Sequence, residues 1–266
     1  MHYNSVLSLS HFSDSDFRKD AIEIFRHFAA IYPGFPEGRE NAKIWETIQA
    51  WRAFRDLGVL GDGAEVLGVG AGFEPLVFWL TNHVRRVFAT DLYETNTEWK
   101  EAVTTMLTDP AALCPELMPF NERRLAVQYM NALDLKYEDN SFDGIFSCGS
   151  IEHFGSLDNV TKASAEMGRV LKPGGILSLS TEFRISGPEG IGIPGAILFT
   201  PELIEQTIVK PSGLQWVDEL DPIDDSVLEY AYPLLDAIEH GTRPRSICLT
   251  HAGYTWTSVS IALRKP

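Results

Sequence analysis

The sequence has little cysteine, an excess of acidic over basic residues and no long hydrophobic run. Its three cysteines, Cys114, Cys148 and Cys248, are odd in number, widely spaced and form no CxxC pair. They offer no disulfide framework, which favours a reducing cytoplasm. Apolar runs such as residues 76–80 are far too short to span a bilayer, and the first residues lack the pattern of a signal peptide. We therefore expect a soluble, cytoplasmic protein that does not bind membranes.

Basic residues are outnumbered by acidic ones. There are 22 lysines and arginines against 37 aspartates and glutamates, which gives a formal net charge of −15 over 266 residues. A surface this negative repels phosphate backbones and anionic membranes. We therefore expect no nucleic acid partner. The hydrophobic fraction of 44% is ordinary for a globular chain with a sizeable core.

Residues 1–60 have the pattern of helices and are expected to form an N-terminal helical cover. Five apolar residues fall on one face of the first helix: Phe17, Ala21, Ile24, Phe25 and Phe28. Ser13 and Asp16 have the spacing of a capping box at its start. A second amphipathic helix is marked by Ile44, Trp45, Ile48 and Trp51. Packing against a core is favoured for these aromatic stripes over a role as a lid above a site.

From residue 65 onward, short apolar strands alternate with helical segments. Strands are expected at residues 65–69, 86–90, 125–129, 144–147, 176–181, 214–220 and 255–263. Strands separated by helices, such as the one expected at 159–171, imply parallel βαβ units. We predict an α/β fold over residues 61–266, with a doubly wound, mostly parallel, seven-stranded sheet. Segments 183–199 and 220–247 are expected to be insertions at the acceptor site.

A glycine-rich turn follows the first predicted strand. Gly70 and Gly72 permit a tight turn and let backbone N–H groups approach a ligand at a helix N-terminus. Asp91 ends the next strand, 21 residues beyond Gly70, where a carboxylate can accept the hydroxyls of a ribose. An adenosine-type cofactor is therefore favoured over a purely structural turn. A nicotinamide cofactor is disfavoured, because Phe73 and Pro75 stand where the two possible GxGxxG frames need their third glycine.

Further motifs follow in order: NALDL at 131–135, DNSFDGIFS at 139–147, IEHF at 151–154 and EMGRVLKPGG at 166–175. Together with the glycine turn they resemble class I S-adenosylmethionine-dependent methyltransferases of the small-molecule type, over about residues 63–181 and the final strand. The sequence at residues 67–76 and 88–93 also resembles an uncharacterised bacterial group of such enzymes. The resemblance implies a Rossmann-like fold, with S-adenosylmethionine as cofactor and S-adenosylhomocysteine as product.

The resemblance also implies a role for each matching position. Gly68 would belong to the cofactor-binding turn, Gly70 and Gly72 would face the methionine part of the cofactor, and Asp91 would bind its ribose. The adenine would be flanked by four residues: Leu92, Asn131, Ala132 and Leu133. Ser147 and Cys148, at the end of the fourth predicted strand, would lie near the sulfonium.

Two positions depart from the family pattern. Gly68 stands where the family commonly has an acid, and Glu74 stands where it has a glycine. Our hypothesis is that the negative charge has moved. Glu74, at a helix N-terminus that stabilises anions, would bind the ammonium group of the cofactor directly or through water. The alternative is that Glu74 only caps the helix.

His153, Glu152 and Glu182 are the candidate catalytic residues. An alcohol acceptor must lose its proton as it attacks, and a histidine with a pKa near neutral suits that task. The structural alternative is that the Glu-His pair merely begins a helix. The three residues could also hold a divalent metal, but no further carboxylate lies at 147–150, so no metal site is expected.

The remaining segments do not identify the acceptor molecule. The glycine- and proline-rich residues 187–195 would form either a lid over the acceptor or an ordinary surface loop. Acidic residues at 221–236 would recognise a hydroxyl-rich or cationic acceptor, or form a solvated face. We predict methyl transfer to a small-molecule acceptor, preferably an oxygen of a sugar or polyol. The alternatives are N- or C-methylation, a nicotinamide-dependent oxidoreductase, and a non-catalytic cofactor-binding partner subunit.

Overall fold

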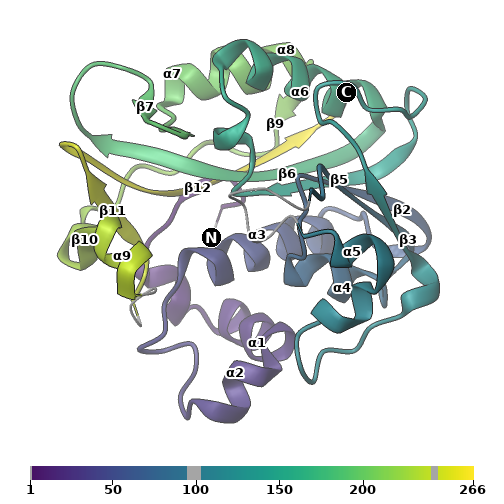
Figure 1. The fold of residues 1–266 in the computed structure, drawn as a ribbon, viewed down its shortest axis with the longest axis horizontal. Helices are drawn as coiled ribbons and strands as arrows, with labels where there is room; N and C mark the ends of the chain where they lie inside the picture. Colours follow the sequence, from purple (N-terminus) through teal and green to yellow (C-terminus); the bar gives the residue numbers. More distant parts are fainter. Residues whose placement is uncertain (1, 95–102, 241–244) are drawn as a thin grey trace.

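The computed structural model describes residues 2–94, 103–240 and 245–266. They form one large sheet with helices on both of its faces (Figure 1). The sheet has ten strands in the order β10-β11-β12-β6-β5-β2-β3-β4, and β1 and β9 also pair with β12. The α/β class predicted from the alternation of strands and helices is confirmed.

Five neighbouring strands of the sheet run parallel to one another. They are β2 (Gly61–Val69), β3 (Val84–Asp91), β4 (Leu125–Tyr129), β5 (Phe142–Cys148) and β6 (Leu171–Ser186). β2, β5 and β6 carry continuous buried runs, as expected for strands covered on both faces. β6 extends beyond the predicted end at residue 181, because its pairing with β12 continues from Ile176 to Ser186. Glu182, predicted to follow this strand, therefore lies within it.

The sheet has more strands than the seven predicted, and the additional ones lie on its β12 side. β12 (Tyr254–Arg264) runs antiparallel to β6 and forms a hairpin with β11 (Cys248–His251). The two turn residues, Ala252 and Gly253, have φ values of +51° and +83°, as a type I′ turn requires. Three further short strands complete this end: β1 (Ser5–Val6), β9 (Gln215–Trp216) and β10 (Ala231–Pro233). The strand predicted at 214–220 is reduced to β9.

The first of the two predicted N-terminal helices is divided at Phe25 into two helices, and the second is present as one. They are α1 (Ser15–Ile24), α2 (Arg26–Ile31) and α3 (Ala42–Asp56). The cap of α1 is Asp14, whose carboxylate accepts from the backbone N–H of Phe17, so the predicted capping role of Ser13 is wrong. α3 packs against the sheet, and Trp45 and Phe54 on it are fully buried. This segment is not wholly helical, since β1 pairs with β12.

The remaining helices connect the strands. α4 (Pro75–Leu80) follows β2, and α6 (Leu157–Val170) links β5 to β6. The others are α5 (Thr105–Thr108), α7 (Pro201–Ile204), a π-helical stretch Glu205–Val209, α8 (Lys210–Ser212) and α9 (Leu234–His240). Five short 3-10 helices lie at Leu9–Ser13, Pro110–Leu113, Glu122–Arg124, Ile151–His153 and Asp225–Tyr230.

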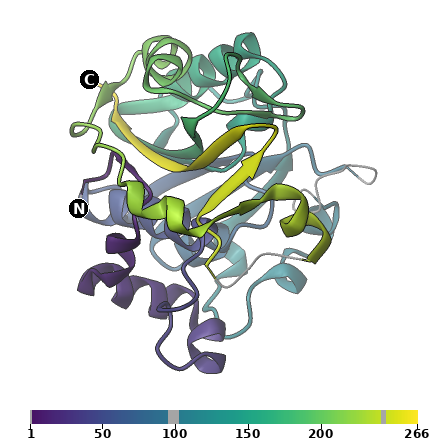
Figure 2. The same ribbon diagram turned by 90° about the vertical axis from the view of Figure 1, so that its left-hand side faces the viewer.

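The sheet separates the two large hydrophobic clusters of the core, and a third, small cluster contains Leu198, Tyr254 and Trp256. One lies between the sheet and α3 and α4, and contains Trp45, Phe54 and Phe78. The other lies between the sheet and α6 to α8, and contains Ile145 and Val160. Figure 1 shows these helices on opposite sides of the sheet. Figure 2 is viewed toward the edge of the sheet that carries β10, β11 and α9. In the described part of the chain, no helix is both long enough and apolar enough to cross a membrane.

His11 anchors the N-terminal segment to α3. Its Nδ1 accepts hydrogen bonds from Trp45 Nε1, at 2.9 Å, and from the Ser8 backbone nitrogen, at 3.3 Å. Both bonds need an unprotonated Nδ1. Burial lowers the pKa of His11 to about 4. The folded protein therefore holds this imidazole neutral at pH values where the unfolded chain would protonate it.

We predict that this histidine makes the protein less stable in acid. Between about pH 6.5 and pH 4 the unfolded state binds a proton that folded His11 does not, so the free energy of unfolding falls as pH decreases, by up to about 3 kcal/mol. The His11→Gln variant lacks this titration. Urea unfolding at pH 7, 5 and 4 should show that the difference in free energy of unfolding between wild type and variant becomes smaller as the pH is lowered. A difference that stays constant would contradict the prediction.

Candidate functional site

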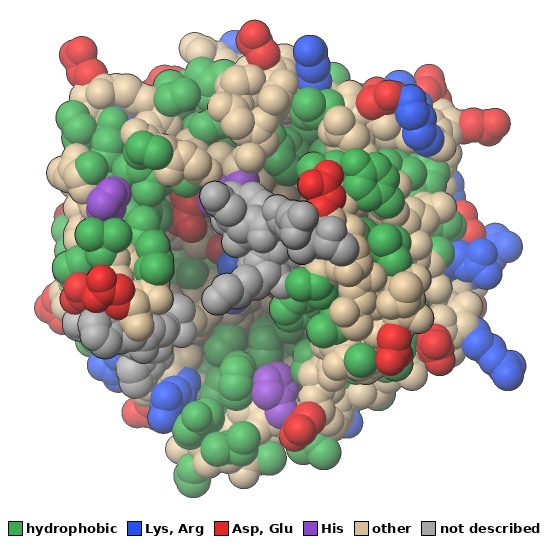
Figure 3. Space-filling view, viewed as in Figure 1, with side chains coloured by type: hydrophobic (Ala, Val, Ile, Leu, Met, Phe, Trp, Pro, Cys, Tyr) green, Lys and Arg blue, Asp and Glu red, His purple; other side chains and the backbone are tan. Residues whose placement is uncertain are grey.

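A pocket of about 660 Å³ lies at the carboxyl ends of the parallel strands. Its lining comes from the start of α3, the glycine turn after β2, the end of β3, the segment after β4, and the ends of β5 and β6. Its volume is within the range of about 300–1,000 Å³ that small-molecule sites occupy. Figure 3 shows the molecule hollowed on this face, with acidic side chains inside the hollow.

The glycine turn is held from two sides. Gly70 and Gly72 both have left-handed backbones, with φ values of +59° and +45°. A Cβ on Gly70 would lie 1.9 Å from Ser150 Oγ, so only glycine fits there. The buried hydroxyl of Tyr93 donates to the Gly72 carbonyl at 2.9 Å. Tyr93 was not among the predicted site residues, although the sequence around it matched a family motif.

Asp91 lies beside this turn, at the end of β3. Its carboxylate accepts hydrogen bonds from the backbone nitrogens of Gly72, at 2.9 Å, and Leu92, at 2.7 Å. Burial raises the pKa of Asp91, and these two N–H donors oppose the rise. The carboxylate thus lines the pocket in a fixed orientation, as its predicted contact with a ribose requires.

The predicted adenine-flanking residues also line the pocket: Leu92, Asn131, Ala132 and Leu133. The Asn131 side chain accepts from the Leu133 backbone nitrogen at 2.9 Å, which fixes the turn after β4. Met130 joins this lining and was not predicted. The structure therefore brings the second half of the predicted cofactor site next to Asp91.

Gly68 and Ser147 were predicted to contact the cofactor, but both are fully buried outside the pocket lining. A Cβ on Gly68 would lie 2.5 Å from Phe146 Cζ and 2.8 Å from Ala71 Cβ, so no acid fits at this position. Ser147 points to the opposite face of β5 from Cys148, because successive side chains of a strand alternate. Cys148 does line the pocket, as predicted.

Glu74 also lines the pocket, at the start of α4. Glu74 is the N-cap residue of α4, but its side chain makes no capping hydrogen bond. Glu74 Oε1 instead lies 3.8 Å from the ammonium nitrogen of Lys43. Lys43 was not predicted, since it comes from the N-terminal helix α3 and no local motif marks it.

The Lys43 ammonium lies among several acceptors. Its Nζ is 3.2 Å from Glu46 Oε2 and donates to the Cys148 carbonyl at 3.4 Å. Burial alone would lower the pKa of Lys43, but the negative charges of Glu46, Glu74 and Glu152 raise it by more than burial lowers it. The pKa of Lys43 therefore lies well above its ordinary value. Lys43 therefore carries its positive charge at neutral pH.

Glu152 and Glu182 lie together at the floor of the pocket. Glu152 is 2% exposed and accepts from Thr181 Oγ1 at 2.9 Å. Burial raises the pKa of both carboxyls, and the charge of Glu152 raises the pKa of Glu182 further. This pair therefore binds a proton more readily than two isolated carboxylates would.

His153 faces the same pocket from the 3-10 helix Ile151–His153. Its Nδ1 lies 2.7 Å from the Gly195 carbonyl, and its Nε2 lies 3.8 Å from Glu152 Oε1. Because a carbonyl only accepts, Nδ1 carries the hydrogen in the neutral ring and Nε2 carries the lone pair. The three predicted catalytic residues thus line one pocket. Glu152 and His153 lie on a helical turn, as the structural alternative also expected, whereas Glu182 lies on β6.

Gly195 belongs to the glycine- and proline-rich segment predicted as a lid or surface loop. Part of this segment forms a small hairpin of β7 (Gly192–Ile193) and β8 (Ala196–Ile197). It contacts His153 through the Gly195 carbonyl. The described residues of 221–236 do not line the pocket.

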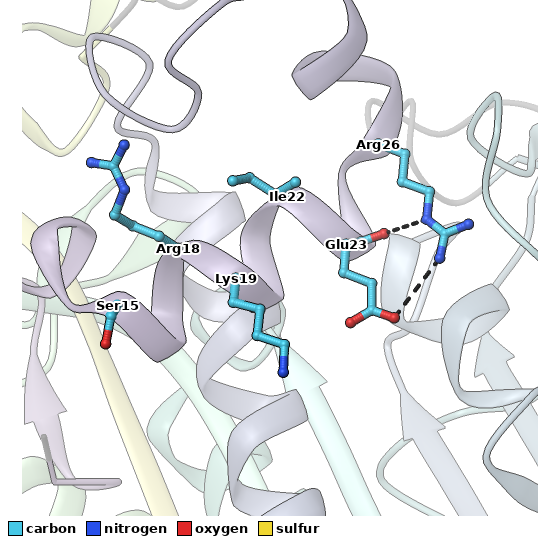
Figure 4. Close-up of a pocket in the computed structure, with 6 residues that line it drawn as sticks. All are labelled: Ser15, Arg18, Lys19, Ile22, Glu23 and Arg26. Carbon is cyan, nitrogen blue, oxygen red and sulfur yellow. Dashed lines mark hydrogen bonds and ion pairs between the residues drawn. The ribbon is translucent and has the colours of Figure 1, made fainter.

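Two other observations bear on ligands. Among the described residues, no group of three or more His, Cys, Asp and Glu side chains is arranged to hold a metal. A second hollow of about 660 Å³ lies on the outer side of α1, lined by Ser15, Arg18, Lys19, Ile22, Glu23 and Arg26. Figure 4 shows its basic side chains pointing in different directions, with Arg26 paired to Glu23 at 3.8 Å. Its groups do not converge on a common point.

Comparison with known proteins gives one family match and several structural neighbours. Residues 67–179 match the family model of a methyltransferase domain. A sterol 24-C-methyltransferase of Aspergillus fumigatus is 28% identical over 148 residues, which is 50% of this chain and 37% of that protein. The chain therefore spans little more than a third of this curated relative.

The solved neighbours resemble the whole fold. The [4+2]-cyclase SpnF superposes with a TM-score of 0.55 at 16% identity, over 93% of this chain and 94% of its own. A geranyl diphosphate methyltransferase solved in complex with S-adenosylmethionine has a TM-score of 0.54 at 12% identity, over 90% and 95%. At these identities the likeness establishes the fold alone.

We predict that Gly70→Ala damages the pocket while a matched glycine substitution does not. Gly174 also has a positive φ, of +80°, but a Cβ there would meet nothing within 4 Å. Both variants introduce backbone strain, whereas only Gly70→Ala forces the turn against Ser150. Calorimetric titration with S-adenosylhomocysteine should show at least about tenfold weaker binding for Gly70→Ala. Equal losses in the two variants would contradict a role of this turn in binding.

Proposed function

Because the chain carries a methyltransferase domain and has the fold of class I S-adenosylmethionine-dependent methyltransferases, we propose that it methylates a hydroxyl oxygen of a small sugar or polyol. The predicted enzyme class and its cofactor, S-adenosylmethionine, are confirmed by the domain match and the fold. The acceptor, the cytoplasmic location and the exclusion of nucleic acid partners belong to our proposal. The observation that carries the acceptor class is the position of His153 Nε2 beside buried carboxyls in the pocket.

The residues of the pocket fit the cofactor. Asp91 supplies a carboxylate for the ribose hydroxyls, and the lining after β3 and β4 supplies an apolar and amide surface for the adenine. Glu74 supplies an anion for the ammonium group, in place of the acid that Gly68 excludes. When bound, S-adenosylmethionine supplies a methyl group activated by its sulfonium.

His153 is the proposed general base. The Gly195 carbonyl fixes the ring through Nδ1, so that Nε2 can take the proton of an acceptor hydroxyl as that oxygen attacks the methyl group. Glu152 Oε1, 3.8 Å away, stabilises the imidazolium that results. Glu182, beside Glu152 in the pocket lining, orients neighbouring hydroxyls. A protonated carboxyl donates a hydrogen bond and a carboxylate accepts one, so these two groups together suit the hydroxyls of a polyol.

Methylation of an amine is the second candidate. Five acids line the described part of the pocket: Glu74, Asp91, Glu94, Glu152 and Glu182. Such an excess of negative charge attracts cations, so a cationic amine would also be drawn into this site. Methylation of carbon, as in the name of the sterol methyltransferase relative, needs no histidine base for a hydroxyl proton. Mutation of His153 distinguishes these acceptors from a hydroxyl.

The acceptor class is tested directly with labelled cofactor. Purified protein is incubated with a small-molecule extract and S-adenosylmethionine labelled in its methyl group, and the products are identified by mass spectrometry. We expect the label on an oxygen of a hydroxyl-rich metabolite. Label on nitrogen or carbon would overturn the proposed acceptor while leaving the methyltransferase assignment in place.

The role of His153 is tested in the same assay with the acceptor found there. His153→Ala should lower the rate of methyl transfer at least about a hundredfold, because the acceptor hydroxyl loses its base. Binding of S-adenosylhomocysteine, measured by calorimetry, should change less than about twofold and serves as the control for folding. If the variant keeps its activity, His153 is not the base and N- or C-methylation is favoured.

A further inference from the structure

Lys43 is the only lysine or arginine among the described residues that line the pocket. The rest of its charged lining consists of five acids and His153. A ligand with an anionic group would meet repulsion almost everywhere in this pocket. Within the described part of the lining, the ammonium of Lys43 is the one place where such a group finds a permanent positive charge.

The position of this ammonium is built by three chain segments. The Glu46 carboxylate, 3% exposed and bonded to Ser258 Oγ at 2.6 Å, holds it from α3. Gly149, after β5, has a φ of +59°, and a Cβ there would lie 2.1 Å from Lys43 Nζ. Glycine at 149 thus leaves the space that the ammonium occupies. Even so, the Lys43 side chain is 54% exposed, since it faces the open pocket.

The amino-acid end of the cofactor carries one positive and one negative charge. Glu74 and Lys43 offer one charge of each sign in adjoining positions, with Oε1 and Nζ 3.8 Å apart. A contact of this length with a half-exposed ammonium is weak, so exchanging it for two contacts to a ligand costs little. Glu46 keeps Lys43 in place during that exchange, because its closer contact with the ammonium does not involve Glu74.

We propose that Lys43 binds the carboxylate of the cofactor's amino-acid end, while Glu74 binds its ammonium group. This proposal rests on the proposed function, in which the pocket holds S-adenosylmethionine. It makes α3, which lies outside the matched domain at residues 67–179, part of the cofactor site. The ion pair between Lys43 and Glu74 then opens to receive a zwitterion.

The experiment compares three probes that differ only in the amino-acid end. They are S-adenosylhomocysteine, its decarboxylated amine analogue, and 5′-methylthioadenosine, which lacks both charges. Calorimetric titration of Lys43→Met should show at least about tenfold weaker binding of S-adenosylhomocysteine. Binding of the other two probes should change less than about twofold. Lys43→Arg, which keeps the charge, should retain most of the affinity for S-adenosylhomocysteine.

Two further variants serve as controls. Glu74→Gln should weaken both S-adenosylhomocysteine and the amine analogue, because each carries the ammonium group, and should leave 5′-methylthioadenosine unchanged. Lys43→Met leaves Glu46 without its counter-ion, which endangers folding. The double variant Lys43→Met/Glu46→Gln removes that charge and should show the same dependence on the probe.

The outcomes separate this proposal from the proposed function. Equal loss of all three probes in both Lys43 variants would make the lysine purely structural and would overturn the inference. Loss of the amine analogue to the same extent as S-adenosylhomocysteine would also overturn it, because the carboxylate would then not be the group recognised. If wild-type protein binds none of the three probes, the cofactor assignment itself fails and the inference falls with it.

Discussion

The site depends on the parallel pairing of β2 with β3 on one side and with β5 on the other. The chain leaves β2 toward β3 through α4, and reaches β6 from β5 through α6 on the opposite face of the sheet. At such a switch point the connecting segments diverge and leave a crevice at the carboxyl ends of the strands. The glycine turn, Asp91 and the residues after β5 meet there for that reason.

Charge is the second feature that organises this crevice. Carboxylates that leave water lose solvation, and they stay charged only where donors or cations compensate them. Asp91 is compensated by two backbone N–H groups, and Glu46 by Lys43 and Ser258. Glu152 and Glu182 differ from these, because the charge of Glu152 adds to the effect of burial in raising the pKa of Glu182. The pocket thus combines fixed charges for binding with carboxyls that can exchange a proton.

The fold itself leaves the reaction undetermined. One neighbour with this fold is named a cyclase and another a methyltransferase, at nearly equal structural similarity. The strands fix where a ligand binds, whereas the segments that surround the strand ends fix what is done to it. In this chain those segments include the start of α3 and the hairpin of β7 and β8, which touches His153 through Gly195. Both segments lie outside the matched residues 67–179.

The sequence by itself predicted the five parallel strands and most of the segments that line the pocket at their carboxyl ends. Strand and helix periods follow from which residues are apolar, and the glycine turn and Asp91 are marked by spacing along the chain. Only the tertiary structure decided which side chains reach the pocket. It excluded Gly68 and Ser147 through the packing of Phe146 and the alternation of β5. It also brought in Lys43, which is 105 residues from Cys148 in sequence yet bonds to its carbonyl. Such contacts follow from how a helix packs on a sheet, which no local pattern encodes.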